Sequence, residues 1–326
     1  MKILNLSKIN RKHIPLLATI TVFVVVYLIG SIAYPGFLSI RVFSNLFIDN
    51  SFVGIIAIGM TFVILSGGID LSVGSVVAFI CIFSAKMIEV YHIHPMWVML
   101  MSLGMGAALG LVMGCLIHFF ELPAFLVTLV GMFLARGLSF MVSLQSIPIY
   151  HDFFSNLNNI GIPLGGIVKL TFSGIVFIVV FLIGVYLSHF TKFGRNTYAI
   201  GGNEQSSILM GLPVGKTKIL IYTLSGTLSA LGGIIYSLYT LSGYPLATVG
   251  LELDVIAAVV IGGTLLTGGL GFVEGTLVGV LILGLIQTFI SFQGTLSSWW
   301  TKIVIGLLLF FFILIQRFLS GATKES

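Results

Sequence analysis

Three charged side chains stand within or beside long apolar runs of this chain, where a charge is costly unless it has a partner or a function. Asp70, in the stretch LSGGIDLSVGS, is the one charged residue between Asn50 and Ala85. Arg136 lies in GMFLARGLSF, and Glu274 lies in TGGLGFVEG. Such residues line a transport path, pair with another group inside a membrane, or cap a helix, and the surrounding elements must decide between these roles.

The neighbours of Asp70 favour a capping role. Two spans of about twenty residues each fill the interval 50–85, so we expect a tight turn at 66–70. Gly67 and Gly68 can end a helix in the left-handed conformation, and Asp70 then accepts backbone N–H groups at the start of the next helix. A role on a transport path or at an interface remains the alternative for this carboxylate.

Arg136 is the stronger candidate for pairing inside the membrane. The alternative is that its long side chain reaches back to the lipid headgroups, because it lies about one or two helical turns from the predicted outer end of its run. The sequence leaves both interpretations open.

The surroundings of Asp70 recur later in the chain. Ser66-Gly67-Gly68-Ile69 matches Thr267-Gly268-Gly269-Leu270 at an offset of 201 positions, and the match continues without a gap. In the second copy Gly271 takes the place of Asp70, and Glu274 follows three residues later, where a capping-box carboxylate reaches back to the backbone. Transporter folds often carry internal repeats, and the order of the apolar runs makes these two copies parallel.

The composition identifies a polytopic membrane protein. Hydrophobic residues make up 58% of the 326 residues and charged residues only 8%, whereas ordinary soluble domains have about 25% charged residues. We predict one all-α permease domain over residues 1–326, with about ten transmembrane helices. The apolar runs are 14–34, 47–66, 71–90, 96–119, 124–144, 167–190, 217–241, 253–270, 273–292 and 300–319.

The distribution of basic residues predicts the topology. Most Lys and Arg residues fall in the termini and in alternate loops, which places both termini in the cytoplasm. The first apolar run is too long for a signal peptide, so we expect an uncleaved span. Two connections are long enough for structure of their own: the loop 145–166 is predicted outside, and the more polar loop 191–218 is predicted inside.

Several functional classes are disfavoured. The stretch GLPVGKT has three residues between Gly211 and Gly215, where a phosphate-binding loop requires four. His92 and His94 have no third metal ligand nearby, so no metal site is expected. Scattered basic residues argue against a nucleic-acid partner. No catalytic group stands in a recognisable frame, so we expect neither an enzyme nor a cofactor.

Four stretches together resemble the sugar permease family of bacterial ABC importers, of the ribose and galactose type. They are ILSGGIDLSVGS, PAFLVTLVGMFLARGL, FGRNTYAIGGNE followed by SSILMG, and LELDVIAAVVIGGTLLTGGLGFVEGTLVG. The resemblance extends over residues 50–320. Within the family, VSLQSIPI and GTLSSWWTKIVIGLL are most similar to permeases of galactofuranose importers.

This resemblance implies one half of a pore in the bacterial inner membrane, which moves a monosaccharide by alternating access. Galactofuranose or a related sugar is the substrate it implies. It also implies three protein partners: a separate ATPase subunit, a periplasmic sugar-binding protein, and a second permease, either a paralogue or a copy of the same chain.

The resemblance further implies a cytoplasmic coupling helix that contacts the ATPase. In place of the Glu-Ala-Ala of the family's EAAxxxG pattern this chain has Gln205-Ser206-Ser207, and it keeps the terminal glycine as Gly211. The residues themselves agree, because this polar, small-sided segment can form a short helix that suits docking into a groove. An ordinary solvated loop is the alternative. The candidate coupling residues are Asn203, Glu204, Gln205, Ser206, Ser207 and Gly211.

A stand-alone ion-coupled secondary transporter or a channel is the alternative function. Such carriers usually show acids or interrupted helices near the middle of the membrane. Because this chain is expected to place its acids mainly at helix ends, the sequence favours the ABC permease.

Overall fold

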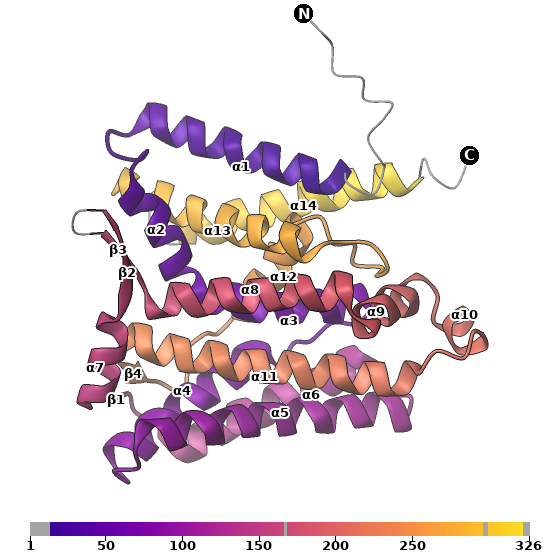
Figure 1. The fold of residues 1–326 in the computed structure, drawn as a ribbon, viewed down its shortest axis with the longest axis horizontal. Helices are drawn as coiled ribbons and strands as arrows, with labels where there is room; N and C mark the ends of the chain where they lie inside the picture. The colour runs from indigo at the N-terminus through magenta and orange to yellow at the C-terminus, as the bar shows by residue number, and fades with distance from the viewer. Residues whose placement is uncertain (1–13, 166–167, 296–298, 322–326) are drawn as a thin grey trace, which may run out of the picture.

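The computed structural model describes residues 14–165, 168–295 and 299–321, and the described chain is mostly helical. Its long helices lie side by side along one axis (Figure 1). The predicted helical class is confirmed, with two small two-stranded sheets beside the helices.

The first half of the chain contains α1 (Ile14–Ala33), α2 (Ile40–Asp49), α3 (Ser51–Leu65), α4 (Val73–Glu89), α5 (Pro95–Phe119), α6 (Ala124–Val142) and α7 (Asp152–Asn159). The second half contains α8 (Phe172–Phe190), α9 (Lys192–Gly202), α10 (Glu204–Leu209), α11 (Val214–Thr240), α12 (Leu251–Ile261), α13 (Val273–Gln293) and α14 (Trp299–Gly321). Strand β1 (Ile147–Pro148) pairs antiparallel with β4 (Ser242–Gly243), and β2 (Gly161–Gly165) pairs antiparallel with β3 (Val168–Thr171).

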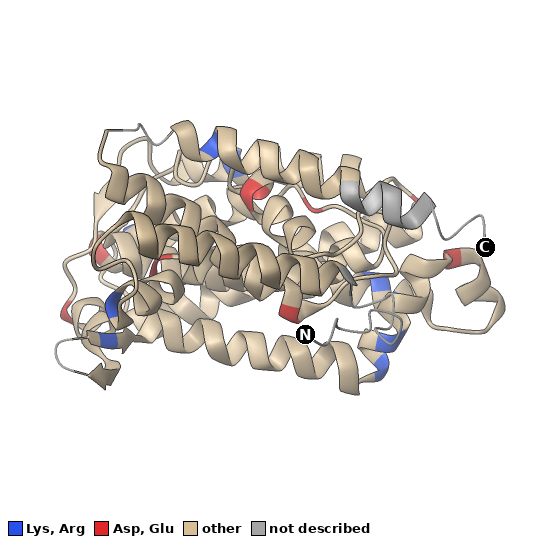
Figure 2. Cartoon of the chain, turned by 90° about the horizontal axis from the view of Figure 1, so that it is seen from above, with Lys and Arg blue, Asp and Glu red and all other residues tan. Residues whose placement is uncertain are grey.

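The two ends of the bundle differ in their loops. We call the end with α9 and α10 the α10 end, and the end with α7 and the four strands the α7 end (right and left in Figure 1). Lys and Arg residues lie mostly toward these two ends, whereas some Asp and Glu residues lie along the middle of the bundle (Figure 2). The position of the basic residues fits a bundle that crosses a membrane along its long axis, because charges are costly in hydrocarbon.

The predicted number of about ten spans is not confirmed. Among the described residues, six helices are long and apolar enough to cross a membrane: α1, α5, α6, α8, α11 and α13. Helices α2 and α3, which meet at an angle of 56°, make a seventh if they count as one span. Each of the other predicted runs contains a helix, but α4, α12 and the apolar part of α14 are shorter than this criterion requires.

The helices on either side of Asp70 are short because the chain between them is not helical. The expected tight turn at 66–70 is wrong: α3 has 15 residues, α4 has 17, and residues 66–72 form an irregular connection. Gly67 has a φ of +84°, which ends α3 at little cost because glycine lacks a Cβ. Gly67 is exposed, whereas Asp70 and Ser72 are fully or almost fully buried, so this connection runs from the surface of the protein into its interior.

The core lies around α3, in which all residues except Phe52 are buried. The long helix α11 packs on α3, α4 and α5. Its contact with α5 is close, since a methyl group added at Gly110 would lie 2.2 Å from the carbonyl oxygen of Tyr222. Small residues allow such an approach between helix backbones, which van der Waals contact then stabilises.

Candidate functional site

Asp70 joins the connection 66–72 to the middle of α11. Its Oδ1 accepts hydrogen bonds from the Ser72 amide at 2.9 Å and the Ser72 hydroxyl at 2.6 Å. Its Oδ2 accepts a hydrogen bond from the Ser225 hydroxyl at 2.7 Å. Ser225 lies eleven residues into the 27-residue helix α11. The carboxylate therefore lies deep between the two ends of the bundle, and not at a helix end near the membrane surface as the sequence led us to expect.

The capping role of Asp70 takes a form that the sequence did not predict. The amide that it accepts belongs to Ser72, the residue just before α4, and no backbone amide inside α4 bonds to it. The same carboxylate also binds a helix 155 residues further along the chain. Asp70 thus stabilises the break in the helical path and fixes that break to α11.

Arg136 pairs inside the bundle. Its Nη1 donates to the carbonyl oxygens of Pro245 at 2.7 Å and Ala247 at 3.0 Å. Of the two interpretations left open by the sequence, the geometry favours pairing, although the partners are backbone carbonyls. The guanidinium supports the irregular segment 244–250, which lies alongside α6.

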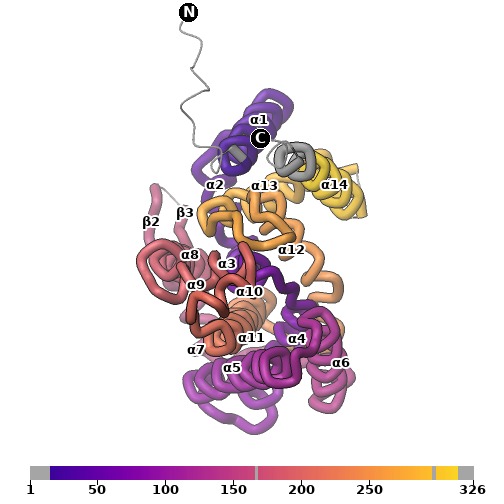
Figure 3. Tube along the Cα trace, turned by 90° about the vertical axis from the view of Figure 1, so that its right-hand side faces the viewer, coloured from indigo at the N-terminus to yellow at the C-terminus, as the bar shows by residue number. Residues whose placement is uncertain are grey.

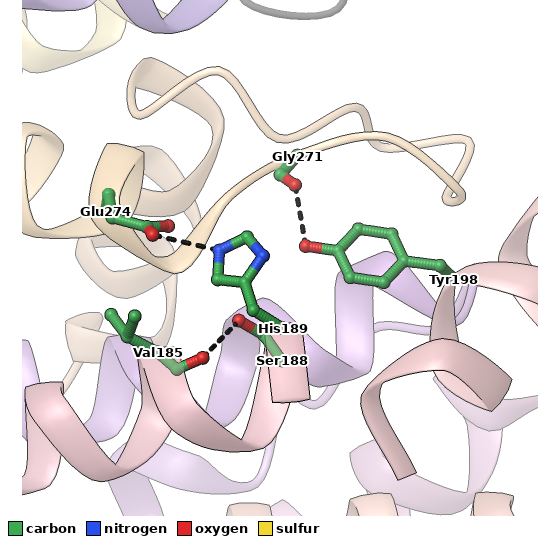
Figure 4. A network of polar contacts seen from close by, with 6 residues as sticks. All are labelled: Val185, Ser188, His189, Tyr198, Gly271 and Glu274. Carbon is green, nitrogen blue, oxygen red and sulfur yellow. Dashed lines mark hydrogen bonds and ion pairs between the residues drawn. The ribbon is translucent and has the colours of Figure 1, made fainter. Parts of the chain in front are cut away.

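Glu274 lies in the first turn of α13 and contacts α8. Its Oε1 is 2.9 Å from His189 Nε2 (Figure 4). The predicted capping box is therefore wrong, because this oxygen faces the histidine and Oε2 has no hydrogen-bond partner among the described residues. The carboxylate still lies at a helix N-terminus, where the helix dipole favours negative charge.

The two copies of the repeat touch each other, and the end of α9 lies against both. The amide of Gly269 donates to the carbonyl oxygen of Leu65 at 2.9 Å. A methyl group added at Gly201 would lie 1.7 Å from that same oxygen and 2.5 Å from the Gly269 nitrogen. A methyl group added at Gly268 would lie 2.8 Å from the Gly67 nitrogen. We call this meeting point of residues 65–68, 201–202 and 268–269 the glycine junction.

The candidate coupling segment forms the short helix α10. Asn203 caps it, since its Oδ1 accepts the Ser206 amide at 2.8 Å. Gly211, the terminal glycine of the pattern, has a φ of +74° and ends the segment in the left-handed conformation. Glu204 pairs with Lys218 of α11 at 2.6 Å, which fixes the base of α10 to the bundle.

The exposed surface of α10 is apolar at its tip. Leu209 is 88% exposed, and Ile208 and Met210 are also exposed. Gln205 and Ser206 are exposed, but Ser207 is fully buried and donates to the Asn203 carbonyl at 2.9 Å. Ser207 therefore supports α10 from inside and does not present a small side chain to a partner, which differs from our expectation for this position.

A cavity of about 880 Å³ opens at the α10 end. Glu204, Gln205 and Ile208 of α10 line its outer part. Ser66, Gly67, Gly68 and Tyr222 also line it, so the cavity connects the candidate coupling segment with the helix break that holds Asp70. Its lining combines apolar residues such as Ile117 and Leu212 with polar ones such as Glu204 and Lys218, and its volume is that of a site for a small molecule.

Sequence reasoning missed the residues that hold these elements together. Ser225, His189, Tyr198 and Gly201 contact partners far away in the chain, and no local pattern marks them. The repeated Gly-Gly pair was the one available signal, because it indicated that two distant segments share a conformation. Among the described residues, no group of three or more His, Cys, Asp or Glu side chains could hold a metal ion.

Comparisons with known proteins identify the class of this chain. Residues 42–313 match the family described as branched-chain amino acid transport system / permease component. The inner membrane ABC transporter permease protein YjfF of Escherichia coli is 54% identical over 312 residues, which cover 95% of this chain and 94% of the relative. No solved structure matches the chain.

Two further relatives carry the names of sugars. The fructose import permease protein FruG of Bifidobacterium longum is 39% identical, over 95% of this chain and 92% of the relative. The ribose import permease protein RbsC of Escherichia coli is 38% identical, over 87% of this chain and 88% of the relative. The chain belongs to this family of transport permeases. It is a multi-pass membrane component of an ABC transporter and not an enzyme.

Proposed function

We propose that this chain is the permease subunit of an importer that moves a monosaccharide across the bacterial inner membrane, driven by a separate ATPase. The observation that carries the proposal is the cavity that connects α10, whose apolar tip is exposed, with the helix break at 66–72 inside the bundle. The sugar-import names of two relatives support the substrate class. Galactofuranose is the substrate that the resemblance of the sequence favours.

The proposal assigns one partner to each end of the bundle. The ATPase docks on α10, the predicted cytoplasmic element, and the periplasmic sugar-binding protein docks on the α7 end. The second permease, a paralogue or another copy of this chain, packs against the side of the bundle. In this arrangement both chain termini are cytoplasmic; residues 1–13 and 322–326 lie outside the described residues.

Docking on α10 follows from its exposed apolar tip. Leu209 extends its side chain beyond the bundle end with 88% of its surface exposed. A large apolar side chain on a polar loop gains free energy when a groove in a partner buries it. The Asn203 cap and the Glu204–Lys218 pair hold α10 in place, so docking requires little further ordering.

Co-elution of the permease with its ATPase tests this assignment. Leu209→Asp should leave membrane insertion intact, because the side chain points away from the bundle, and should abolish association. Gly211→Val should weaken association, because valine disfavours a φ of +74°. Tyr150→Asp, at an exposed residue of the α7 end, is the matched control and should associate normally. Full association of both α10 variants would refute docking at this helix.

Uptake by the assembled complex tests the substrate. Proteoliposomes that contain the permease pair and ATPase, with binding protein outside, should accumulate galactofuranose. Ribose, fructose and leucine serve as competing substrates of the kinds that the relatives and the family name. Accumulation of leucine and of no sugar would overturn the substrate class, whereas accumulation of ribose or fructose alone would overturn only the choice of galactofuranose.

The interrupted helices keep a stand-alone secondary transporter as the second candidate. The breaks at 66–72 and 262–272 and the buried carboxylate of Asp70 are features that ion-coupled carriers share. The two candidates differ in their energy source. Uptake that continues without ATPase and collapses when the ion gradient is dissipated would establish the carrier.

A further inference from the structure

We propose that Gly201 and Tyr198 of α9 are positioning residues that transmit movement of α10 to both helix breaks through the glycine junction. This inference rests on the proposed function, in which an ATPase moves α10. It concerns the next step, namely how that movement reaches the interior of the bundle.

The first observation is the close approach of backbone at Gly201. The Gly201 Cα lies so near the Leu65 carbonyl oxygen and the Gly269 nitrogen that a methyl group would overlap both. These two atoms also form the hydrogen bond that joins the end of α3 to the second repeat. Because repulsion between atoms in contact rises steeply, α9 cannot advance without displacing both segments.

The second observation is a polar connection beside this backbone contact. Tyr198 donates its hydroxyl to the carbonyl oxygen of Gly271 at 2.9 Å, and Glu274 contacts His189 a short distance away (Figure 4). Burial, together with the charge of Glu274, raises the pKa of Tyr198 to about 12, so the hydroxyl remains a hydrogen-bond donor at neutral pH. The backbone contact transmits a push, and this hydrogen bond transmits a pull.

The short connection between α9 and α10 makes this transmission direct. Asn203 is the residue between the two helices, and its amide donates to the Ala199 carbonyl while its side chain caps α10. A displacement of α10 therefore begins three residues from Gly201, because α10 starts at Glu204. On the far side of the junction, Gly67 and Gly68 line the cavity, so the displacement changes the wall that a substrate would contact.

Two neighbouring glycines provide a matched pair of variants. A methyl group at Gly201 overlaps backbone of other segments, whereas a methyl group at Gly202 has no atom of another segment within 4 Å. Both residues lie in α9 and neither has a positive φ, so the intrinsic cost of alanine is the same. Gly201→Ala should retain ATPase association and lose sugar uptake, while Gly202→Ala should match the wild type in both.

Tyr198→Phe tests the same connection without adding an atom. The variant loses the hydrogen bond to Gly271 and keeps the ring, so the protein should fold and dock its ATPase normally. The ratio of sugar imported to ATP hydrolysed should fall roughly fivefold, the factor that corresponds to one ordinary hydrogen bond. A residue with only a structural role would lower the amount of permease and leave this ratio unchanged.

The outcomes separate this inference from the proposed function. If the wild-type permease fails to bind an ATPase or to import sugar, the proposed function is wrong. If the wild type does both, and Tyr198→Phe keeps the full ratio of sugar to ATP, the transmission through α9 is refuted whether or not Gly201→Ala folds. A lower ratio of sugar imported to ATP hydrolysed in Tyr198→Phe, with normal abundance and normal association with the ATPase, supports transmission through α9.

Discussion

At the scale of single residues, Asp70 shows how a buried charge is accommodated in this bundle. Two serines satisfy its oxygens with three hydrogen bonds, and each serine belongs to a different element. Burial of an unpaired polar group costs free energy. Removal of the carboxylate would therefore leave its three donors without a partner, and removal of a donor would leave the carboxylate less well satisfied. The residue therefore holds together a non-helical segment that would otherwise expose its backbone to an apolar interior.

Substitution of Asp70 should separate hydrogen bonding from charge. Asp70→Asn keeps an oxygen for Ser72 and gains an amide that can donate to the Ser225 hydroxyl, so abundance should change little. Asp70→Leu leaves the Ser72 amide buried without a partner, a cost of about 1–3 kcal/mol, so the amount of folded permease should fall. Fluorescence-detected size exclusion measures both. Normal folding with abolished uptake in Asp70→Asn would instead show that the charge itself acts in transport.

At the scale of elements, α10 depends on one buried hydroxyl and presents its other side to solvent. Ser207 is fully buried and bonds back to the Asn203 carbonyl, whereas Ser206 is exposed. Adjacent residues of a helix point in different directions. A substitution at Ser207 therefore tests the buried side of α10, and a substitution at Ser206 tests its exposed side.

Tryptophan at these two serines should therefore have different effects. Ser207→Trp has no space for the ring and should displace α10, so that association with the ATPase is lost. Ser206→Trp adds its ring on the exposed side and should leave α10 in place. Limited proteolysis of the loop 203–213 distinguishes them, with faster cleavage expected only for Ser207→Trp. Equal cleavage of both variants would contradict the buried role of Ser207.

At the scale of the whole molecule, one side of the bundle has features that lipid does not tolerate. The segment 244–250 is irregular backbone alongside α6, and Val249 at its outer surface is 66% exposed. Lys302 of α14 pairs with Asp254 of α12 on the same side. Irregular backbone and charges at membrane depth require cover by protein or water. We infer that this α6–α12–α14 face meets the second permease across an aqueous path.

Cysteine labelling in intact membranes tests this face. In a chain with Cys81 and Cys115 replaced by serine, Val249→Cys and Leu253→Cys should react with a hydrophilic methanethiosulfonate, because thiols ionise only in contact with water. Ile183→Cys is the control, since this residue is also exposed, at 52%, and lies on α8, on the other side of the bundle from α6 and α14 (Figure 3). Labelling at Ile183 and none at Val249 would place lipid against the α6–α12–α14 face.

The sequence by itself determined the membrane class, the apolar runs, the repeat around the Gly-Gly pairs and the position of the candidate coupling helix. These features depend on local physics: hydropathy along the chain, the conformational freedom of glycine and the capping preference of Asn203. Gly211 follows α10 by two residues and has a φ of +74°, a conformation for which glycine is the usual residue.

Only the tertiary structure decided which distant residues the candidate site residues contact. Asp70 meets Ser225, Glu274 meets His189, and Gly201 meets Leu65 across 85 to 155 residues of chain. The expectation of a tight turn at 66–70 was wrong because the length of an apolar run does not show where a helix breaks inside it. Contacts of this kind depend on how helices pack in space, and a single serine, histidine or glycine carries no sign of its partner in the sequence around it.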